Sequence, residues 1–250
     1  MVSWTSWSTQ EFSLRTMTPI WVFPVYPLLM ITPLATSLIN AIPSTTETLH
    51  LSSQTILAGA LMLQGIGFLV SAIIYSAFLY RLMTQGLPSP SLLPAMFVSV
   101  GPAGFTATGV IQLGTLASKA LPRSTVSALG STDAVSTIIR VLAFAAGLCL
   151  WGLTLWFFVL SVGGQWRCLF GGTHQRPAFS ISFYAFVFPN AALVSSTHAV
   201  GKAFGWRCVE ILGCVFAVLL ICVWVVVFAR TCWGVWRGSL LCKPPEEEDR

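Results

Sequence analysis

The sequence predicts an all-α integral membrane protein with six transmembrane helices arranged as three hairpins. Apolar residues make up 55% of the 250 positions and charged residues only 8%, a balance that excludes an ordinary soluble domain of this size. A membrane helix needs about 20 mainly apolar residues, and runs of that kind with few or no charges occur six times. They cover approximately residues 20–42, 55–80, 94–118, 137–162, 179–200 and 209–229.

Proline is distributed unevenly among these runs. The first, third and fifth runs contain it, whereas the interiors of the second, fourth and sixth do not. A proline inside a helix removes one backbone hydrogen bond and clashes with the preceding turn, so the helix kinks or breaks. We therefore expect broken helices around a cavity and unbroken helices outside, unless the pattern reflects only the general abundance of proline in membrane helices. The prolines are Pro24, Pro27 and Pro33 in the first run, Pro94 and Pro102 in the third, and Pro189 in the fifth.

A broken helix followed by an unbroken one recurs about every 75 to 85 residues, which indicates three copies of one helical hairpin. Channels and transporters commonly arise from such repeats, and their conducting site lies where discontinuous helices meet.

The segments outside the runs predict the topology. Residues 1–19 are expected to form an N-terminal cytoplasmic loop, because they lack the basic start and apolar run of a signal peptide. Residues 20–230 form the transmembrane domain and residues 231–250 a cytoplasmic acidic tail. The net charge of +5 comes from basic residues that flank the runs, so it indicates topology rather than a nucleic-acid partner. Their excess on one side places both termini in the cytoplasm.

The seven cysteines form no Cys-x-x-Cys pair and have no histidine at ligand spacing, so neither a metal site nor a disulfide framework is expected. Cys149, Cys214 and Cys222 would act as small hydrophobic residues inside helices. Cys232 and Cys242 are expected just beyond the last helix, either as idle thiols or as sites of palmitoylation.

Ionisable side chains inside a bilayer are costly, so their identity indicates which ion crosses. No carboxylate falls in the middle of a run, which disfavours a proton relay or a cation pathway and suits anions or neutral solutes. Arg140 and His198 are the candidates for a positive field, but each lies near the end of a run and is expected to be an interfacial anchor. No nucleophile has a suitably placed base and no phosphate loop occurs, so we expect neither an enzyme nor a cofactor.

Three segments resemble a known family. They are TPIWVFPVYPLL at 18–29, MFVSVGPAGFTATGVIQLG at 96–114 and FYAFVFPNAALVSSTHAVGKAFG at 183–205. They resemble the tellurite-resistance and dicarboxylate transporter family of voltage-dependent anion channels, fungal malic acid (C4-dicarboxylate) transporters and fungal sulfite efflux pumps. The resemblance covers nearly the whole chain. The Gly-Pro-x-x-Phe-Thr element looks closer to the malate branch than to the sulfite branch.

The resemblance implies a ten-helix fold of five hairpins, with kinked odd-numbered helices around a pore and even-numbered helices outside, and commonly a homotrimer. It implies passage of small anions across a plasma membrane, most of all C4-dicarboxylates such as malate, with sulfite, nitrate or chloride as the alternative. Phe188 matches the phenylalanine that plugs the pore in channel members, the alternative being ordinary aromatic packing. The implied pore-lining residues are Pro24, Pro27, Ser99, Gly101, Pro102, Phe105, Thr106, Pro189 and Asn190.

The six runs match helices five to ten of that fold, so its first four helices are expected to be missing. Three hairpins cannot close a ring of five. The chain is then a fragment or truncated gene product, a chain whose missing wall comes from other copies, or an inactive remnant. The rival from another class is a non-conducting subunit that packs against a complete relative.

Overall fold

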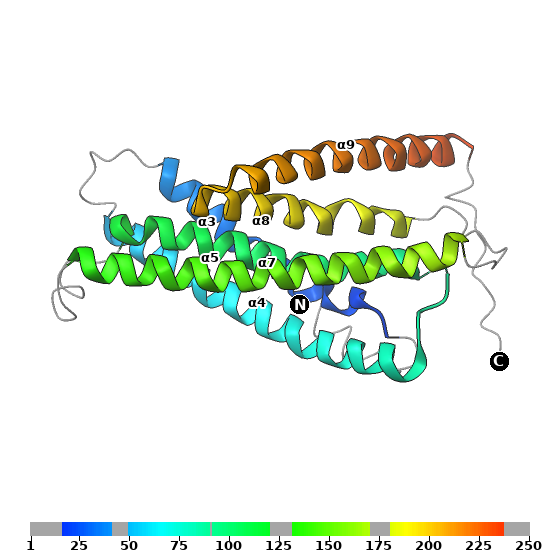
Figure 1. The fold of residues 1–250 in the computed structure, drawn as a ribbon, viewed down its shortest axis with the longest axis horizontal. Coiled ribbons are helices and arrows are strands. Elements are labelled where there is room, and N and C mark those ends of the chain that lie inside the picture. Colours follow the sequence, from blue (N-terminus) through cyan, green and yellow to red (C-terminus); the bar gives the residue numbers. More distant parts are fainter. Residues whose placement is uncertain (1–16, 42–49, 91, 121–131, 171–180, 238–250) are drawn as a thin grey trace.

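A computed structural model describes residues 17–41, 50–90, 92–120, 132–170 and 181–237, and almost all of them are helical (Figure 1). Helices satisfy their backbone hydrogen bonds internally, which is what a chain of this composition requires in lipid. The elements are η2 (Pro19–Val25), α2 (Tyr26–Leu29), α3 (Ile31–Ala41), α4 (His50–Gln85), η4 (Leu93–Ser99), α5 (Val100–Ala120), α7 (Thr132–Phe170), η5 (Ile181–Phe186), α8 (Phe188–Phe204) and α9 (Arg207–Trp236).

Three of the helical stretches are interrupted, and the interruptions coincide with the prolines. The first stretch changes from η2 to α2 and then α3, with Pro24 inside η2 and Pro27 in the first turn of α2. The third changes from η4 to α5 just before Pro102, and the fifth changes from η5 to α8 just before Pro189. The other three helices, α4, α7 and α9, run unbroken for 36, 39 and 30 residues. The proline pattern therefore predicted correctly which helices are interrupted.

Five of the six stretches are long and apolar enough to cross a bilayer, so the chain is an integral membrane protein. The exception is the expected fifth run at 179–200. Its continuous helix α8 has only 17 residues, and its later turns carry hydroxyl groups, His198 and Lys202. The break at Val187 makes α8 shorter than the other membrane-spanning stretches, and its polar side chains make it less hydrophobic.

Several helices extend beyond the expected boundaries, because the apolar run marks only the part that suits lipid. α4 ends at Gln85 and α7 covers Thr132–Phe170. α9 continues to Trp236, so Cys232 is an exposed residue within the last helix, and the expectation that it lies beyond that helix is wrong. Cys242 and the acidic end of the expected tail lie outside the described residues.

The third stretch, η4 with α5, forms the centre of the bundle. In the most apolar part of this stretch 89% of the residues are buried. The corresponding share is 39% in the first stretch and 11–22% in α4, α7 and α9. α5 packs against α3, α4, α7 and α8. Small residues permit this close approach: a Cβ added to Gly104 would lie 2.9 Å from the Ala192 backbone, and one added to Gly109 would lie 2.8 Å from the Thr32 side chain.

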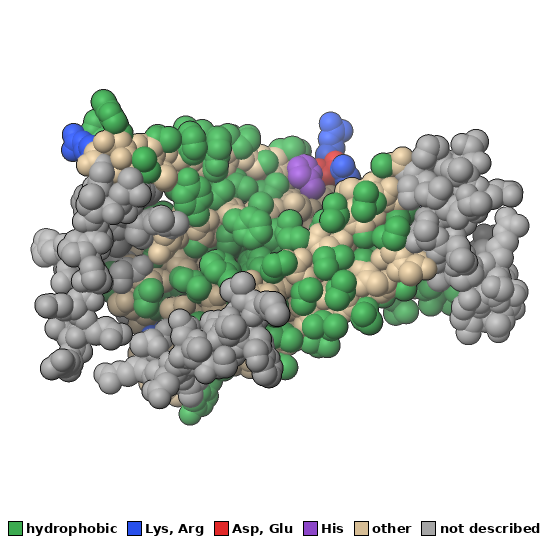
Figure 2. All heavy atoms as spheres, turned by 180° about the vertical axis from the view of Figure 1, so that it is seen from behind, with side chains coloured by type: hydrophobic (Ala, Val, Ile, Leu, Met, Phe, Trp, Pro, Cys, Tyr) green, Lys and Arg blue, Asp and Glu red, His purple; other side chains and the backbone are tan. Residues whose placement is uncertain are grey.

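Hydrophobic side chains cover much of the long sides of the molecule, as Figure 2 shows for one face. Many large apolar side chains on α4, α7 and α9 are more than a third exposed, among them Leu69, Val159 and Ile221. α9 packs mainly on α8 and leaves most of its circumference uncovered. Such surfaces suit contact with lipid tails.

Candidate functional site

Three aromatic rings meet where the three interrupted stretches converge. Tyr26 of α2, Phe105 of α5 and Phe188 of α8 form this group, which we call the aromatic cluster. The Phe188 ring centroid lies 5.4 Å from that of Tyr26 and 5.7 Å from that of Phe105, and the Tyr26 and Phe105 centroids are 6.3 Å apart. These separations are typical of favourable aromatic pairs, so the three segments are joined by direct ring contacts.

Tyr26 is fixed at its hydroxyl end as well as at its ring. It is buried, and its hydroxyl donates a hydrogen bond to the carbonyl oxygen of Val98 at 3.0 Å. Space for the hydroxyl exists because residue 101 is glycine: a Cβ at Gly101 would collide with the Tyr26 hydroxyl oxygen. The position of the tyrosine therefore depends on a glycine in another helix.

The carbonyl that Tyr26 contacts is the one that proline leaves without its usual partner. In an α-helix the Val98 carbonyl would accept from the N–H of residue 102, but Pro102 has none. A second hydroxyl, that of Tyr75 on α4, also donates to this oxygen, at 3.1 Å. The Val100 N–H also approaches this oxygen at the end of η4, and the two buried hydroxyls supply the donors that Pro102 lacks.

These two hydroxyls should be interdependent. Tyr26→Phe or Tyr75→Phe alone leaves one hydroxyl donor on the Val98 carbonyl, and each is expected to cost roughly 0.5–1.5 kcal/mol of stability. The double variant removes both hydroxyls and leaves only the Val100 N–H near the carbonyl, so its loss should exceed the sum of the single losses. Thermal unfolding of the purified protein in detergent measures this. Tyr80→Phe, at a tyrosine 65% exposed, is the control, and strictly additive losses would contradict the shared role.

Phe188 lies at the start of α8, directly after the break. Its side chain is 45% exposed, whereas Tyr26 and Phe105 are buried. Pro189 occupies the first turn of α8, where proline needs no intrahelical partner. The amide nitrogen Nδ2 of Asn190 donates to the carbonyl of Phe186, the last residue of η5, at 2.8 Å. Backbone hydrogen bonds from Val187 to Tyr184 and from Ala191 to Val187 also hold the break, which presents Phe188 on the more open side of the aromatic cluster.

The other pore-lining residues that the resemblance implied differ in burial and in hydrogen-bond partners. Ser99 is buried and donates to the Met96 carbonyl of its own stretch. Thr106 is buried, donates to the Pro102 carbonyl and accepts from the Gln64 amide of α4 at 2.8 Å. Pro24 is half-buried and Pro27 is exposed. The structure thus brings Phe188, Phe105 and Gly101 together around Tyr26, whereas the hydroxyls of Ser99 and Thr106 form their hydrogen bonds with other groups.

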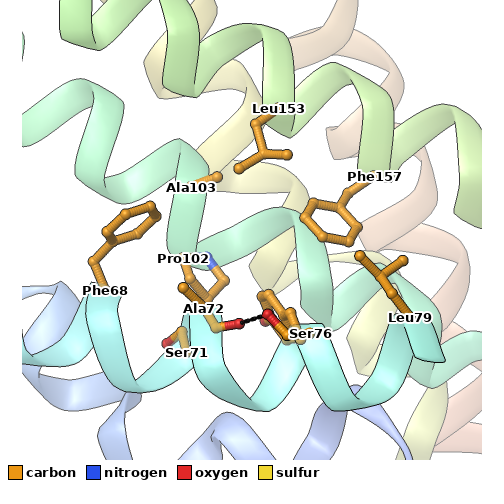
Figure 3. Close-up of a pocket in the computed structure, with 10 residues that line it drawn as sticks. Phe68, Ser71, Ala72, Ser76, Leu79, Pro102, Ala103, Leu153 and Phe157 are labelled. Carbon is orange, nitrogen blue, oxygen red and sulfur yellow. Dashed lines mark hydrogen bonds between the residues drawn. The ribbon is translucent and has the colours of Figure 1, made fainter. Parts of the chain in front are cut away.

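Pro102 also lines a small cavity between α4, α5 and α7, with a volume of about 200 Å³ (Figure 3). In Figure 3, Phe68 and Leu79 of α4 and Phe157 of α7 surround it. Its two serines, Ser71 and Ser76, donate to carbonyls of their own helix, at 2.6 and 2.8 Å. No charged residue is among those that line it. This cavity therefore has no charged side chain that would attract an anion, and its serine hydroxyls already donate to backbone carbonyls.

A larger cavity, of about 650 Å³, lies on the other side of α5. We call it the basic cavity, because Arg140 of α7 and His198 and Lys202 of α8 line it. Residues of α3 and α5 complete the wall, and Phe105 of the aromatic cluster is one of them. The basic cavity and the aromatic cluster are therefore neighbours.

Sequence reasoning did not single out Tyr26, and it did not consider Lys202 as part of a site. A signal for Tyr26 was available, since a tyrosine inside an apolar run needs a hydrogen-bond partner for its hydroxyl. Nothing local indicates that Lys202 shares a cavity with Arg140, because the two residues lie on different helices.

Comparison with known proteins agrees with the membrane architecture. The family described as "Voltage-dependent anion channel" matches residues 1–232. A malic acid transport protein of Schizosaccharomyces pombe is 26% identical, over 100% of this chain and 54% of the relative. A sulfite efflux pump of Arthroderma benhamiae is 27% identical, over 88% of this chain and 54% of the relative.

An uncharacterised transporter of Methanocaldococcus jannaschii is 25% identical, over 93% of this chain and 60% of the relative. The chain thus spans about half the length of the curated relatives it matches. No solved structure matches it.

Proposed function

Because the chain belongs to the voltage-dependent anion channel family, we propose that it moves small anions across a membrane, past a constriction formed at Phe188. The observation that carries this proposal is the aromatic cluster, in which one half-exposed phenylalanine meets two buried rings at the convergence of three interrupted helical stretches. A hydrophobic constriction of this kind blocks a pathway by excluding water. Displacement of the Phe188 ring would admit the ion.

We further propose that the six stretches form three hairpins, with the interrupted stretches inside and α4, α7 and α9 outside. The greater burial of the third stretch and the exposed apolar faces of the unbroken helices support this arrangement. It would form part of a ten-helix, five-hairpin wall. The pathway would be lined by Pro24, Pro27, Ser99, Gly101, Pro102, Phe105, Thr106, Pro189 and Asn190.

The rest of the wall would come from four further helices or from other copies, a homotrimer being the arrangement proposed for the assembly. The proposed location is the plasma membrane, with both termini in the cytoplasm. The substrates proposed first are C4-dicarboxylates such as malate. Malic acid transport proteins are among the relatives that this chain matches over nearly its whole length. Sulfite is the proposed alternative, because sulfite efflux pumps are similar to the same degree.

Flux through liposomes tests this proposal. The purified full chain is reconstituted, and influx of labelled malate, sulfite and chloride is compared with that of liposomes that contain an unrelated membrane protein. We expect malate influx to exceed the control and to exceed sulfite influx. Faster sulfite influx would reject the malate assignment. Influx at the control level for all three anions would reject conduction by this chain alone.

One observation favours a second candidate function. The chain spans about half the length of its curated relatives, and the second function that we propose is that of a non-conducting subunit of a complete relative. Co-expression with a full-length relative separates the two. Stable co-purification combined with control-level flux by the chain alone would favour the subunit.

A further inference from the structure

The positive charges of the basic cavity have no carboxylate partners among the described residues. Arg140 and Lys202 are basic side chains, and neither forms an ion pair with a described residue. Glu210 is the one carboxylate whose side chain the structure describes, and it is not among the residues that line the cavity. Glu210 lies instead against Gly201, where an added Cβ would be 2.7 Å from its Cγ. The described residues that line the cavity therefore include positively charged side chains and no carboxylate.

Arg140 is held without losing its charge. Its guanidinium carbon lies 5.3 Å from the centroid of the Phe144 ring, within the range of a cation–π contact. The Phe144 ring in turn packs on Phe204 of α8, with their centroids 5.8 Å apart. An aromatic face orients a guanidinium but leaves its N–H groups free for an acceptor.

Two further polar side chains line the cavity, and one of them has a buried ring nitrogen without a partner. The Nδ1 atom of His198 is buried and has no hydrogen-bond partner, while its Nε2 lies 4.0 Å from the sulfur of Cys214. The side-chain carbonyl of Gln112 accepts from the Thr36 hydroxyl at 2.8 Å, which leaves the amide N–H₂ available. A buried polar atom without a partner is unfavourable, and in the tautomer in which Nδ1 of His198 carries the proton a bound anion supplies its acceptor.

The basic cavity adjoins the proposed constriction through one residue. Phe105 lines the cavity, and its ring is the one that packs on Phe188 at 5.7 Å. An ion held in the cavity would therefore wait next to the aromatic cluster. This also gives Arg140 and His198 a role beyond the interfacial anchoring expected from the sequence.

We propose that the basic cavity is a binding site for small dianions, meaning dicarboxylates or oxyanions that carry two negative charges. Arg140 and Lys202 would supply the attraction, and His198 and Gln112 would supply hydrogen bonds. A dianion is favoured because Coulomb attraction scales with the product of the charges, so each cation attracts it about twice as strongly as a monovalent ion. The role of the site in transport rests on the proposed function, but binding can be measured without transport.

Calorimetric titration of the purified full chain in detergent tests the site. Malate, sulfite and chloride are the probes, at a pH where malate and sulfite carry two charges. We expect malate and sulfite to bind more tightly than chloride, and binding to weaken as ionic strength rises. The variant Arg140→Gln/Lys202→Gln should weaken dianion binding by at least about tenfold. Arg140→Lys, which keeps the charge, should bind more tightly than Arg140→Gln, and this comparison excludes simple misfolding.

Arg237→Gln is the matched control. Arg237 also lies over an aromatic ring, at 4.5 Å from the centroid of Trp233, but it does not line the basic cavity. Its replacement should leave the affinity unchanged. Unchanged binding in the double variant, an equal loss in the control, or chloride binding as tight as malate binding would each overturn the site. Dianion binding that depends on Arg140 and Lys202, in a chain that shows no flux, would instead refute only the proposed transport.

Discussion

Replacing Phe188 with alanine is expected to increase anion flux through the reconstituted protein by about tenfold or more. The ring is the exposed member of the aromatic cluster, and its removal leaves Tyr26 and Phe105 without the group that closes the gap between them. A tenfold increase corresponds to a barrier lower by about 1.4 kcal/mol, a modest demand on a hydrophobic constriction. Stopped-flow measurement of influx into liposomes, at equal protein content, gives the ratio.

The matched control for this change is Phe228→Ala. Phe228 is 48% exposed, close to the 45% of Phe188, and it stacks on Trp224 of the lipid-facing helix α9. Its loss should leave flux unchanged. If Phe188→Ala conducts no faster than the control variant, Phe188 is an ordinary packed aromatic residue and the constriction lies elsewhere.

Replacing Gly101 with valine is expected to be the most damaging single change to stability. The first added carbon already collides with the hydroxyl of Tyr26, which is buried and hydrogen-bonded and therefore cannot swing aside. Overpacking typically costs about 1–3 kcal/mol. Displacement of the hydroxyl would add roughly the 0.5–1.5 kcal/mol of a lost hydrogen bond. The apparent midpoint of thermal unfolding in detergent should fall accordingly.

Gly152→Val provides the comparison, because a Cβ at Gly152 would meet nothing within 4 Å. This glycine lies on the exposed side of α7, so a side chain there extends toward lipid. Its unfolding midpoint should stay near that of the parent protein. Combining Gly101→Val with Tyr26→Ala should recover part of the loss. Equal effects at both glycines, or no recovery, would show that the damage at Gly101 does not come from the tyrosine.

Much of the architecture could be predicted from the sequence because its causes are local. Lipid requires long apolar helices, and a proline inside a helix interrupts it. Both the membrane-spanning runs and their interruptions could therefore be predicted from the sequence. The ends of the helices were predicted less accurately. Polar residues that flank an apolar run continue the helix without any apolar signal, and α9 therefore includes Cys232.

The arrangement of side chains around the site could be predicted only in part. The family resemblance singled out Phe188 and Phe105, which the structure places in contact. The role of Tyr26 depends on a carbonyl 72 residues away, and the basic cavity depends on which helix ends come together. Such contacts between distant segments follow from packing, and no single segment carries a signal for them.

The Val98 carbonyl accepts hydrogen bonds from two tyrosine hydroxyls, and this limits how α5 can bend. Proline kinks often serve as hinges, but bending α5 at Pro102 would break hydrogen bonds to two tyrosines on two other helices. We therefore expect that joint to resist bending. At the break before Phe188, the Asn190 amide donates to the Phe186 carbonyl, and backbone hydrogen bonds join Val187 to Tyr184 and to Ala191; all of these bonds lie within the fifth stretch. We therefore expect bending near the aromatic cluster to occur at Val187 rather than at Pro102, so that the start of α8 moves relative to α5.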